Sequence, residues 1–397
     1  MTLSPDFVTS WTCPSTSELV ALMLARPAPV QPNSSISLVN ELHPVDLFCY
    51  FSARFGAANG TLNVMRNDNS DNLTHWDWTL SCQYGQIAFW GGNFRTDMWL
   101  LGNFPLQESF KEEIISQIRA DFANYGKAMS AVRKRLEHWT EFVNPYWRLK
   151  RATDQLLTDI ASLVLDPTLG AKIHSPLSLA NNENDWNALT ARYNKAFGLC
   201  YGVRSMLPVL AEALVNLLIF IFVRPDIRKD QRLYDNIIRQ PIDVRIKSLH
   251  INCVGFENAV DYAHDACRHY HSLVNERNYL LHGNVSPEKS SFNEVYFSGT
   301  VPVFKEYRSF WQRTIAVDGE AVGLSRLYEE IATVEAFTEY LLSCLTQKNQ
   351  EAVRAVLAKR DLARNHEDGR LGILFSSLLV DSMPAKRDSD PPDLGPE

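Results

Sequence analysis

The sequence predicts a mainly helical α+β protein with an N-terminal antiparallel β-rich module, a long helical hairpin and a C-terminal helical bundle. Three observations support this prediction. Short β-rich runs separated by turn clusters fill residues 46–104. Apolar residues then recur at alternating steps of four and three from 118 to 143. From about 188 to 348 the chain is again mostly helical in pattern.

The composition bounds the class of protein. With 397 residues the chain exceeds one ordinary core, so we expect two or three domains. A content of 45% hydrophobic and 21% charged residues excludes a disordered or collagen-like chain. The net charge of −7 excludes a wholly basic nucleic-acid coat but leaves room for a local basic patch.

The cysteines indicate a reducing compartment. There are seven, none forms a CxxC pair, and most lie in apolar runs. This usage is typical of buried thiols in a cytoplasmic protein, and it argues against zinc ligation. We therefore predict a cytoplasmic location without a signal peptide, and neither a metal nor a cofactor.

The N-terminal module is predicted to span residues 1–105. Residues 1–45 are rich in Pro and Ser and read as irregular. The β-rich runs that follow lie at residues 47–55, 61–66, 76–82, 86–90 and 98–101. Trp76 and Trp78 share one strand face, where they either stack on a base or ligand or pack into the core. Core packing is the favoured interpretation.

The helical hairpin is predicted over residues 106–165. A first helix with a heptad seam ends at Asn144-Pro145, and a second helix follows over residues 146–164. The hairpin carries basic residues that are candidates for RNA binding: Arg133, Lys134, Arg148, Lys150 and Arg151. They either track phosphates or form an ordinary solvated helix face.

The rest of the chain divides into four predicted parts. A linker covers residues 166–187, the bundle 188–348, a helical extension 349–382, and a disordered tail 383–397. The apolar run at 207–223 contains Glu212 and Asn216. It is short and polar for a bilayer span, so we predict a buried bundle helix and no membrane partner.

The segment 261–283 holds the candidate chemistry. On a helical wheel its apolar residues fill one arc, and Arg277 lies near the centre of that arc. A charge on a core stripe is costly unless it has a partner. Asn278 and His282 are four residues apart and share the edge of this face, and Gly283 follows as a helix C-cap would. The helix dipole at that end favours a protonated imidazole.

The residues Arg277-Asn278 and His282-Gly283 resemble the signature of the HEPN (higher eukaryotes and prokaryotes nucleotide-binding) superfamily. That signature is an Arg, then four to six residues of which the first is polar, and then a His. The bare pattern also occurs at Arg133/His138, Arg245/His250 and Arg360/His366. The polar Asn278, the apolar face around Arg277 and the closing Gly283 together select the Arg277/His282 pair.

The resemblance implies a four- or five-helix bundle that forms a homodimer and cuts RNA without a metal. His282 would act as general acid or base, Arg277 would hold the phosphate, and Asn278 would position His282 or the phosphate. Glu212 is expected to pair with Arg277. His271 and His264 either extend the site, bind a metal with His269, or are plain polar residues, which is the favoured interpretation.

The resemblance therefore predicts an endoribonuclease effector of a toxin or anti-phage abortive-infection system. Its product would be a 2′,3′-cyclic phosphate, and its N-terminal half would regulate it by binding a phage or cellular trigger. The alternative is a non-catalytic HEPN-like module for dimerisation or for binding a nucleotide or partner. In that case the bundle would dimerise, and the Arg277/His282 pair would bind the nucleotide or partner. A purely structural interpretation of the two residues is that Arg277 is a buried ion-pair partner and His282 only caps its helix.

Overall fold

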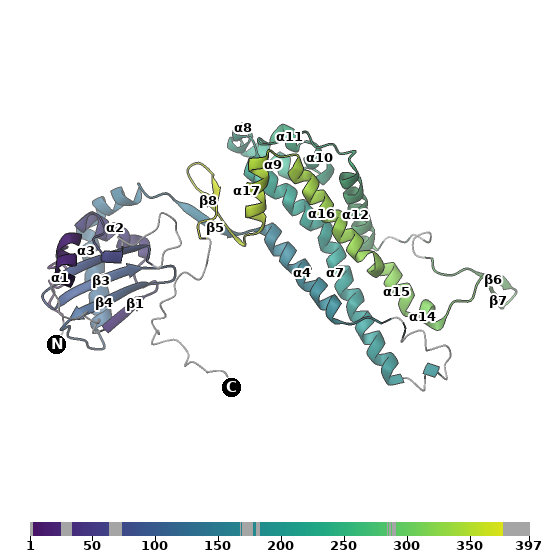
Figure 1. Ribbon diagram of the computed structural model, residues 1–397, viewed down its shortest axis with the longest axis horizontal. Coiled ribbons are helices and arrows are strands. Elements are labelled where there is room, and N and C mark those ends of the chain that lie inside the picture. Colours follow the sequence, from purple (N-terminus) through teal and green to yellow (C-terminus); the bar gives the residue numbers. More distant parts are fainter. Residues whose placement is uncertain are drawn as a thin grey trace. The chain divides into compact units, whose positions relative to one another are not determined.

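The computed structural model describes residues 3–24, 34–62, 74–166, 168, 178–179, 183–283, 285, 287 and 291–375. The chain forms two compact units. The sheet unit comprises Met1–Thr140 and Ala363–Glu397, and the helical unit comprises Glu141–Leu362. An antiparallel sheet near the N-terminus followed by helices confirms the mainly helical α+β class (Figure 1).

The sheet unit is built on four antiparallel strands in the order β1-β4-β3-β2. The strands are β1 (Ser34–Leu38), β2 (Trp76–Cys82), β3 (Gly85–Gly91) and β4 (Thr96–Gly102). Helices α1 (Thr16–Leu24), α2 (Pro44–Phe55) and α3 (Phe110–Arg133) complete the unit. One sheet face and the helices α2 and α3 share a core in which Trp78 lies opposite Phe89, and Phe89 opposite Met98.

Three of the predicted strands are confirmed as β2, β3 and β4, but the run at 47–55 is wrong because it forms α2. Its buried residues Leu47, Tyr50 and Phe51 follow a helical spacing, and Pro44 opens the helix. The run at 61–66 begins in a short turn, and its residues from 63 on lie outside the described chain. Trp78 is 1% exposed and its ring lies tilted against that of Phe51 at 5.6 Å, which confirms core packing for Trp78, and the partly buried Trp76 packs beside it.

The predicted helical hairpin of residues 106–165 and the border near 105 are wrong. The first helix ends at Arg133 as α3, and residues 139–143 form strand β5 (Trp139–Val143) before α4 (Pro145–Ser162). The seam side chains Ile118 and Phe122 pack into or against the core of the sheet unit, whereas α4 packs on α7 in the helical unit. The seam of α3 thus packs against a sheet and not against a second long helix.

The chain passes from one unit to the other within β5 and returns at β8 (Asp361–Asn365). These strands belong to a small sheet of order β5-β8-β9, with β9 at Leu371–Gly372. The predicted helical extension of 349–382 therefore contains helix α17 (Gln347–Leu357) and then strands. Most of the predicted linker 166–187 and the whole predicted tail 383–397 lie outside the described residues.

The helical unit is a bundle of long helices around α7 (Figure 1). These are α4, α7 (Glu183–Phe222), α12 (Asp265–His282) and α16 (Leu327–Ser343). Between α7 and α12 lie α8 (Pro225–Lys229), α9 (Gln231–Arg239), α10 (Ile242–Lys247) and α11 (Leu249–Asn252). Between α12 and α16 lie the hairpin β6 (Val295–Ser298) and β7 (Val301–Phe304), α14 (Phe310–Arg313), α15 (Ile315–Val322) and a 3₁₀ turn (Leu324–Arg326).

Within the described residues α7 is the one helix long and apolar enough to cross a membrane. Length and composition alone support that statement, and half of its most apolar window is buried inside the protein. Leu207, Leu214 and Leu218 of this helix are nearly inaccessible and contribute to the main core of the bundle. The predicted role of residues 207–223 as a bundle helix agrees with this packing.

Candidate functional site

Helix α12 is fixed at both ends and along its inner face. The His264 side chain caps its start by accepting from the Ala266 N–H at 3.2 Å, and Gly283 closes it with a φ of 59°. Such a left-handed residue is a common helix C-cap, so the predicted end is confirmed. Inside the bundle, the Tyr270 ring stacks on Phe337 of α16 at 4.2 Å, and its hydroxyl donates to the Pro208 carbonyl.

The three candidate catalytic residues occupy the last turns of α12. Arg277 and Asn278 are half-buried, and His282 is exposed. The Nε of Arg277 is buried and has no hydrogen-bond partner among the described residues. A buried guanidinium nitrogen without a partner is unfavourable, so an anion that accepts from it would be stabilised.

The helical geometry separates Arg277 from His282. At about 100° per residue, five residues place the two side chains roughly 140° apart around α12. Asn278 and His282, four residues apart, share a face. Arg277 therefore points toward a different side of the helix than the imidazole, and a single copy of α12 offers a phosphate-binding group and a proton-transfer group on separate sides.

The predicted ion pair between Glu212 and Arg277 is wrong. The Oε1 of Glu212 accepts from the Nη2 of Arg245 at 2.5 Å. The antiparallel register of α7 and α12 explains why: the Tyr201 hydroxyl donates to the Leu280 carbonyl, and Tyr270 reaches Pro208. Arg277 is thus level with the stretch of α7 before Pro208, whereas Glu212 lies one turn beyond it.

The other histidines of this segment have structural contacts. The His264 ring stacks on Tyr340 at 3.9 Å, and the Nδ1 of His271 lies 3.1 Å from the Tyr262 hydroxyl. His269 is exposed. No group of three or more His, Cys, Asp or Glu side chains suited to a metal occurs among the described residues. The sulfur of Cys267 is no better placed for chemistry, because burial raises its thiol pKa to about 12.

The basic residues proposed for RNA binding do not belong to one body. Arg133 and Lys134 lie in the sheet unit, whereas Arg148, Lys150 and Arg151 lie in the helical unit. Arg133 pairs with Asp46, and Lys150 with Asp154 at 2.5 Å. Arg151 lies over the Trp147 ring. These contacts are those of a solvated helix surface.

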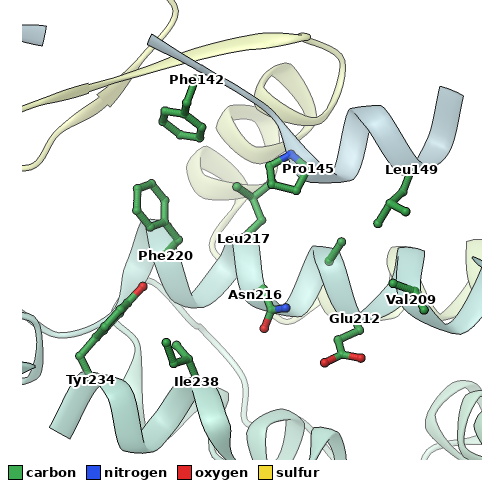
Figure 2. Close-up of a pocket in the computed structure, with 11 residues that line it drawn as sticks. Phe142, Pro145, Leu149, Val209, Glu212, Asn216, Leu217, Phe220, Tyr234 and Ile238 are labelled. Atoms are coloured by element: carbon green, nitrogen blue, oxygen red, sulfur yellow. The ribbon is translucent and has the colours of Figure 1, made fainter. Parts of the chain in front are cut away.

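A groove in the helical unit was not anticipated from the sequence. It has a volume of about 600 Å³ and lies between α4, α7 and α9 (Figure 2). Its wall is mostly apolar, with Phe142, Phe220 and Tyr234 at one end. Glu212 and Asn216 provide the polar part, and the nearly buried Arg245 hydrogen-bonds both side chains. The sequence signal that would have indicated this groove is the i, i+4 spacing of Glu212 and Asn216 on an otherwise apolar helix.

Comparisons with models of protein families, with curated proteins and with solved structures found no match to this chain. The candidate function accordingly depends on Arg277, Asn278 and His282 and on their setting at the end of α12.

Proposed function

We propose that the helical unit is a metal-independent endoribonuclease of the HEPN type. The observation that carries the proposal is the end of α12, where the half-buried Arg277 has an unsatisfied Nε and His282 is exposed just before the capping Gly283. A guanidinium with an unsatisfied nitrogen can stabilise charge on a phosphate and an accessible imidazole can transfer a proton, and both functions promote the cleavage of a phosphodiester.

In the proposed reaction the 2′-oxygen of a ribose bonds to the adjacent phosphorus while the bond from phosphorus to the 5′-oxygen breaks. The products are a 2′,3′-cyclic phosphate and a 5′-hydroxyl, so the proton lost by the 2′-hydroxyl is balanced by one gained at the 5′-oxygen. His282 accepts or delivers that proton. Arg277 binds the phosphate oxygens and stabilises the charge that develops on them. Asn278, on the same face as His282, positions the imidazole or the phosphate.

The proposal includes a homodimer. Because Arg277 and His282 diverge by roughly 140° on one helix, two copies of α12 facing each other would supply both groups to one phosphate. In the HEPN superfamily, which the sequence resembles, the helical bundle forms such a dimer. The sheet unit would then bind a phage or cellular trigger and control the pairing, as in a cytoplasmic toxin or abortive-infection effector.

The divergence of Arg277 and His282 also favours a second candidate function. A bundle whose two groups never meet at one phosphate would be a non-catalytic module that dimerises or binds a nucleotide or protein partner. The net charge of −7 agrees with weak non-specific binding to RNA.

The test is an RNA cleavage assay with the full-length chain in the presence of EDTA. We expect total RNA to be cut to fragments with 5′-hydroxyl and cyclic phosphate ends, and His282→Ala to lose at least about 100-fold in rate. His269→Ala is the matched control, since His269 is an exposed histidine of α12 about 20 Å away along the helix. Equal cleavage by the wild type and His282→Ala would exclude the assigned role.

An experiment in cells tests the same assignment if the purified protein needs a trigger in order to cleave RNA. We expect expression of the wild type to arrest growth and to leave cleaved RNA with cyclic phosphate ends, and His282→Ala to do neither. RNA that stays intact while the wild type still binds it would favour the non-catalytic module.

A further inference from the structure

The hairpin β6–β7 exposes apolar side chains on a scale that is unusual for the surface of a single chain. Tyr296 is 59% exposed, Phe297 68% and Val301 60%, and Val303 is half exposed as well. No residue from 295 to 304 carries a charge. Apolar surface of this kind marks an interaction site.

The hairpin also lacks support within its own sheet. β6 and β7 have four residues each and form a two-stranded sheet, with no third strand among the described residues. Isolated two-stranded hairpins are marginal in water, and a free edge strand is a template for another strand. The hairpin would gain most from a third and fourth strand.

The hydrogen-bond pattern shows which edge is open. The Lys305 N–H donates to the Glu294 carbonyl at 3.1 Å, so these residues form a hydrogen-bonded pair. Alternation along an antiparallel ladder then makes Val295 opposite Phe304, and Phe297 opposite Pro302, non-hydrogen-bonded pairs. The backbone N–H and C=O groups of Val295 and Phe297 therefore point outward from β6.

The outer edge of β7 is closed by its sequence. Pro302 has no N–H, and its non-hydrogen-bonded pairing places the missing donor on the outward side. A proline on an edge strand is a common protection against further pairing. Of the two edges, β6 alone offers an uninterrupted set of donors and acceptors.

We propose that β6 pairs with β6 of a second copy of this chain, antiparallel and about a two-fold axis at Tyr296. In this register Val295 of each copy exchanges N–H and C=O groups with Phe297 of the other, which gives four hydrogen bonds between the chains. Tyr296 lies opposite its own equivalent. The product is a four-stranded sheet with the order β7-β6-β6-β7.

Self-complementarity identifies a second copy as the occupant. The same two residues supply donors and acceptors on both sides of the axis, as a two-fold interface requires. On one face Tyr296 and Val303 of both copies form a continuous apolar row, and on the other face Phe297 meets Val295. Pro302 at each outer edge stops the addition of further copies, so the assembly closes at two chains. This contact does not depend on RNA cleavage.

Disulfide trapping tests the register. In the proposed pairing Tyr296→Cys brings two cysteines to a Cα separation of about 4.5 Å, within the range of a disulfide. Val303→Cys is the matched control: it lies on the same face and is similarly exposed, but three strand spacings, about 14 Å, separate it from its equivalent. We expect mild oxidation to convert Tyr296→Cys to a covalent dimer and to leave Val303→Cys as a monomer on a non-reducing gel.

A proline variant tests the edge itself. Val295→Pro removes an outward N–H and leaves the hydrogen bonds within the hairpin intact, so we expect the full-length variant to keep its thermal unfolding midpoint and to dimerise at least about tenfold more weakly than the wild type in sedimentation, whether or not α12 also contributes to the dimer. The proposal is overturned if the wild type stays monomeric, if Val295→Pro dimerises like the wild type, or if Tyr296→Cys and Val303→Cys cross-link equally.

Discussion

The guanidinium of Arg204 on α7 and the carboxylate of Glu330 on α16 form a bidentate ion pair in the interior of the bundle. The Nε donates to Oε2 at 2.7 Å and the Nη2 to Oε1 at 2.5 Å, and the two side chains are 4% and 11% exposed. The remaining Nη1 donates to the Val322 carbonyl at 2.8 Å. All three guanidinium nitrogens are thus satisfied, in contrast to the Nε of Arg277.

Arg204→Ala should destabilise the helical unit by about 3–5 kcal/mol, because it leaves the Glu330 carboxylate buried without a counter-charge. Urea unfolding followed by circular dichroism measures this loss. The double variant Arg204→Met/Glu330→Leu is the control, and it should recover most of the stability since no charge remains buried. A double variant as unstable as Arg204→Ala would show that shape, not charge, dominates at this position.

Asn144 should be equally sensitive for a different reason. Its side chain caps α4 by accepting from the Tyr146 N–H at 3.1 Å, while its Nδ2 donates to the carbonyls of Val356 and Lys359 at 3.0 Å each. It is fully buried. Asn144→Ala should therefore lower the free energy of unfolding by about 2–4 kcal/mol, because it removes the cap of α4 and the two hydrogen bonds to the carbonyls of Val356 and Lys359.

Asn144→Asp separates the two contributions, and the same unfolding measurement applies. The aspartate keeps the cap but replaces the donor by an acceptor that faces two carbonyls. We expect it to be at least as destabilising as alanine. If Asn144→Asp unfolded like the wild type, the contacts to Val356 and Lys359 would contribute nothing.

Elements that local signals determine could be predicted from the sequence, whereas elements that depend on packing between distant segments could not. The strands β2, β3 and β4 and the end of α12 were predicted because turn residues and Gly283 are local signals. The predicted strand at 47–55 is wrong because its aromatic residues favour strands when they are considered locally. In the folded chain these residues pack as one face of a helix against the sheet, and that long-range packing determines their conformation.

The candidate site shows the same limit. The positions of Arg277, Asn278 and His282 on one helix followed from periodicity. The partner of Glu212 did not, because the sequence pattern does not show which arginine packs against α7 at that level, and only the register of the packed helices distinguishes Arg245 from Arg277. At the motif match Arg245/His250, Arg245 is 7% exposed and its two Nη atoms bond to Asn216 and Glu212, whereas its Nε, like that of Arg277, has no hydrogen-bond partner among the described residues.

Buried thiols should resist alkylation in the folded protein. Loss of hydration on burial raises the thiol pKa of Cys253 and Cys267 to about 12 and that of Cys200 to about 11. At neutral pH these groups hold almost no thiolate, which is the reactive form. We expect iodoacetamide, followed by peptide mass spectrometry, to leave these three cysteines unmodified in the native protein and to modify all seven after denaturation. Rapid native labelling of Cys267 would contradict its place in the core.

The sheet unit should lose stability in acid partly through Glu41. Burial alone would raise the pKa of its carboxyl, but hydrogen bonds from Lys111 at 2.6 Å and from the N–H groups of Val39 and Asn40 lower it to about 2. A carboxylate with a lowered pKa in the folded state contributes stability that is present above its ordinary value of 4.5 and is lost as the pH falls from there toward 2.

Glu41→Gln should therefore destabilise the protein at about pH 6 and differ little from the wild type as the pH approaches about 2. The difference in urea midpoint between the two proteins, measured across this range, checks the sign. The effect is modest, because both side chains of the pair are about one-third exposed and solvent screens their attraction. Glu112→Gln, at an exposed neighbour of Lys111 on α3, is the control, because it removes one negative charge from the same surface without touching the hydrogen bonds of Glu41. If the difference in urea midpoint between the wild type and Glu41→Gln increased as the pH fell, the folded state would not favour the ionised carboxylate of Glu41.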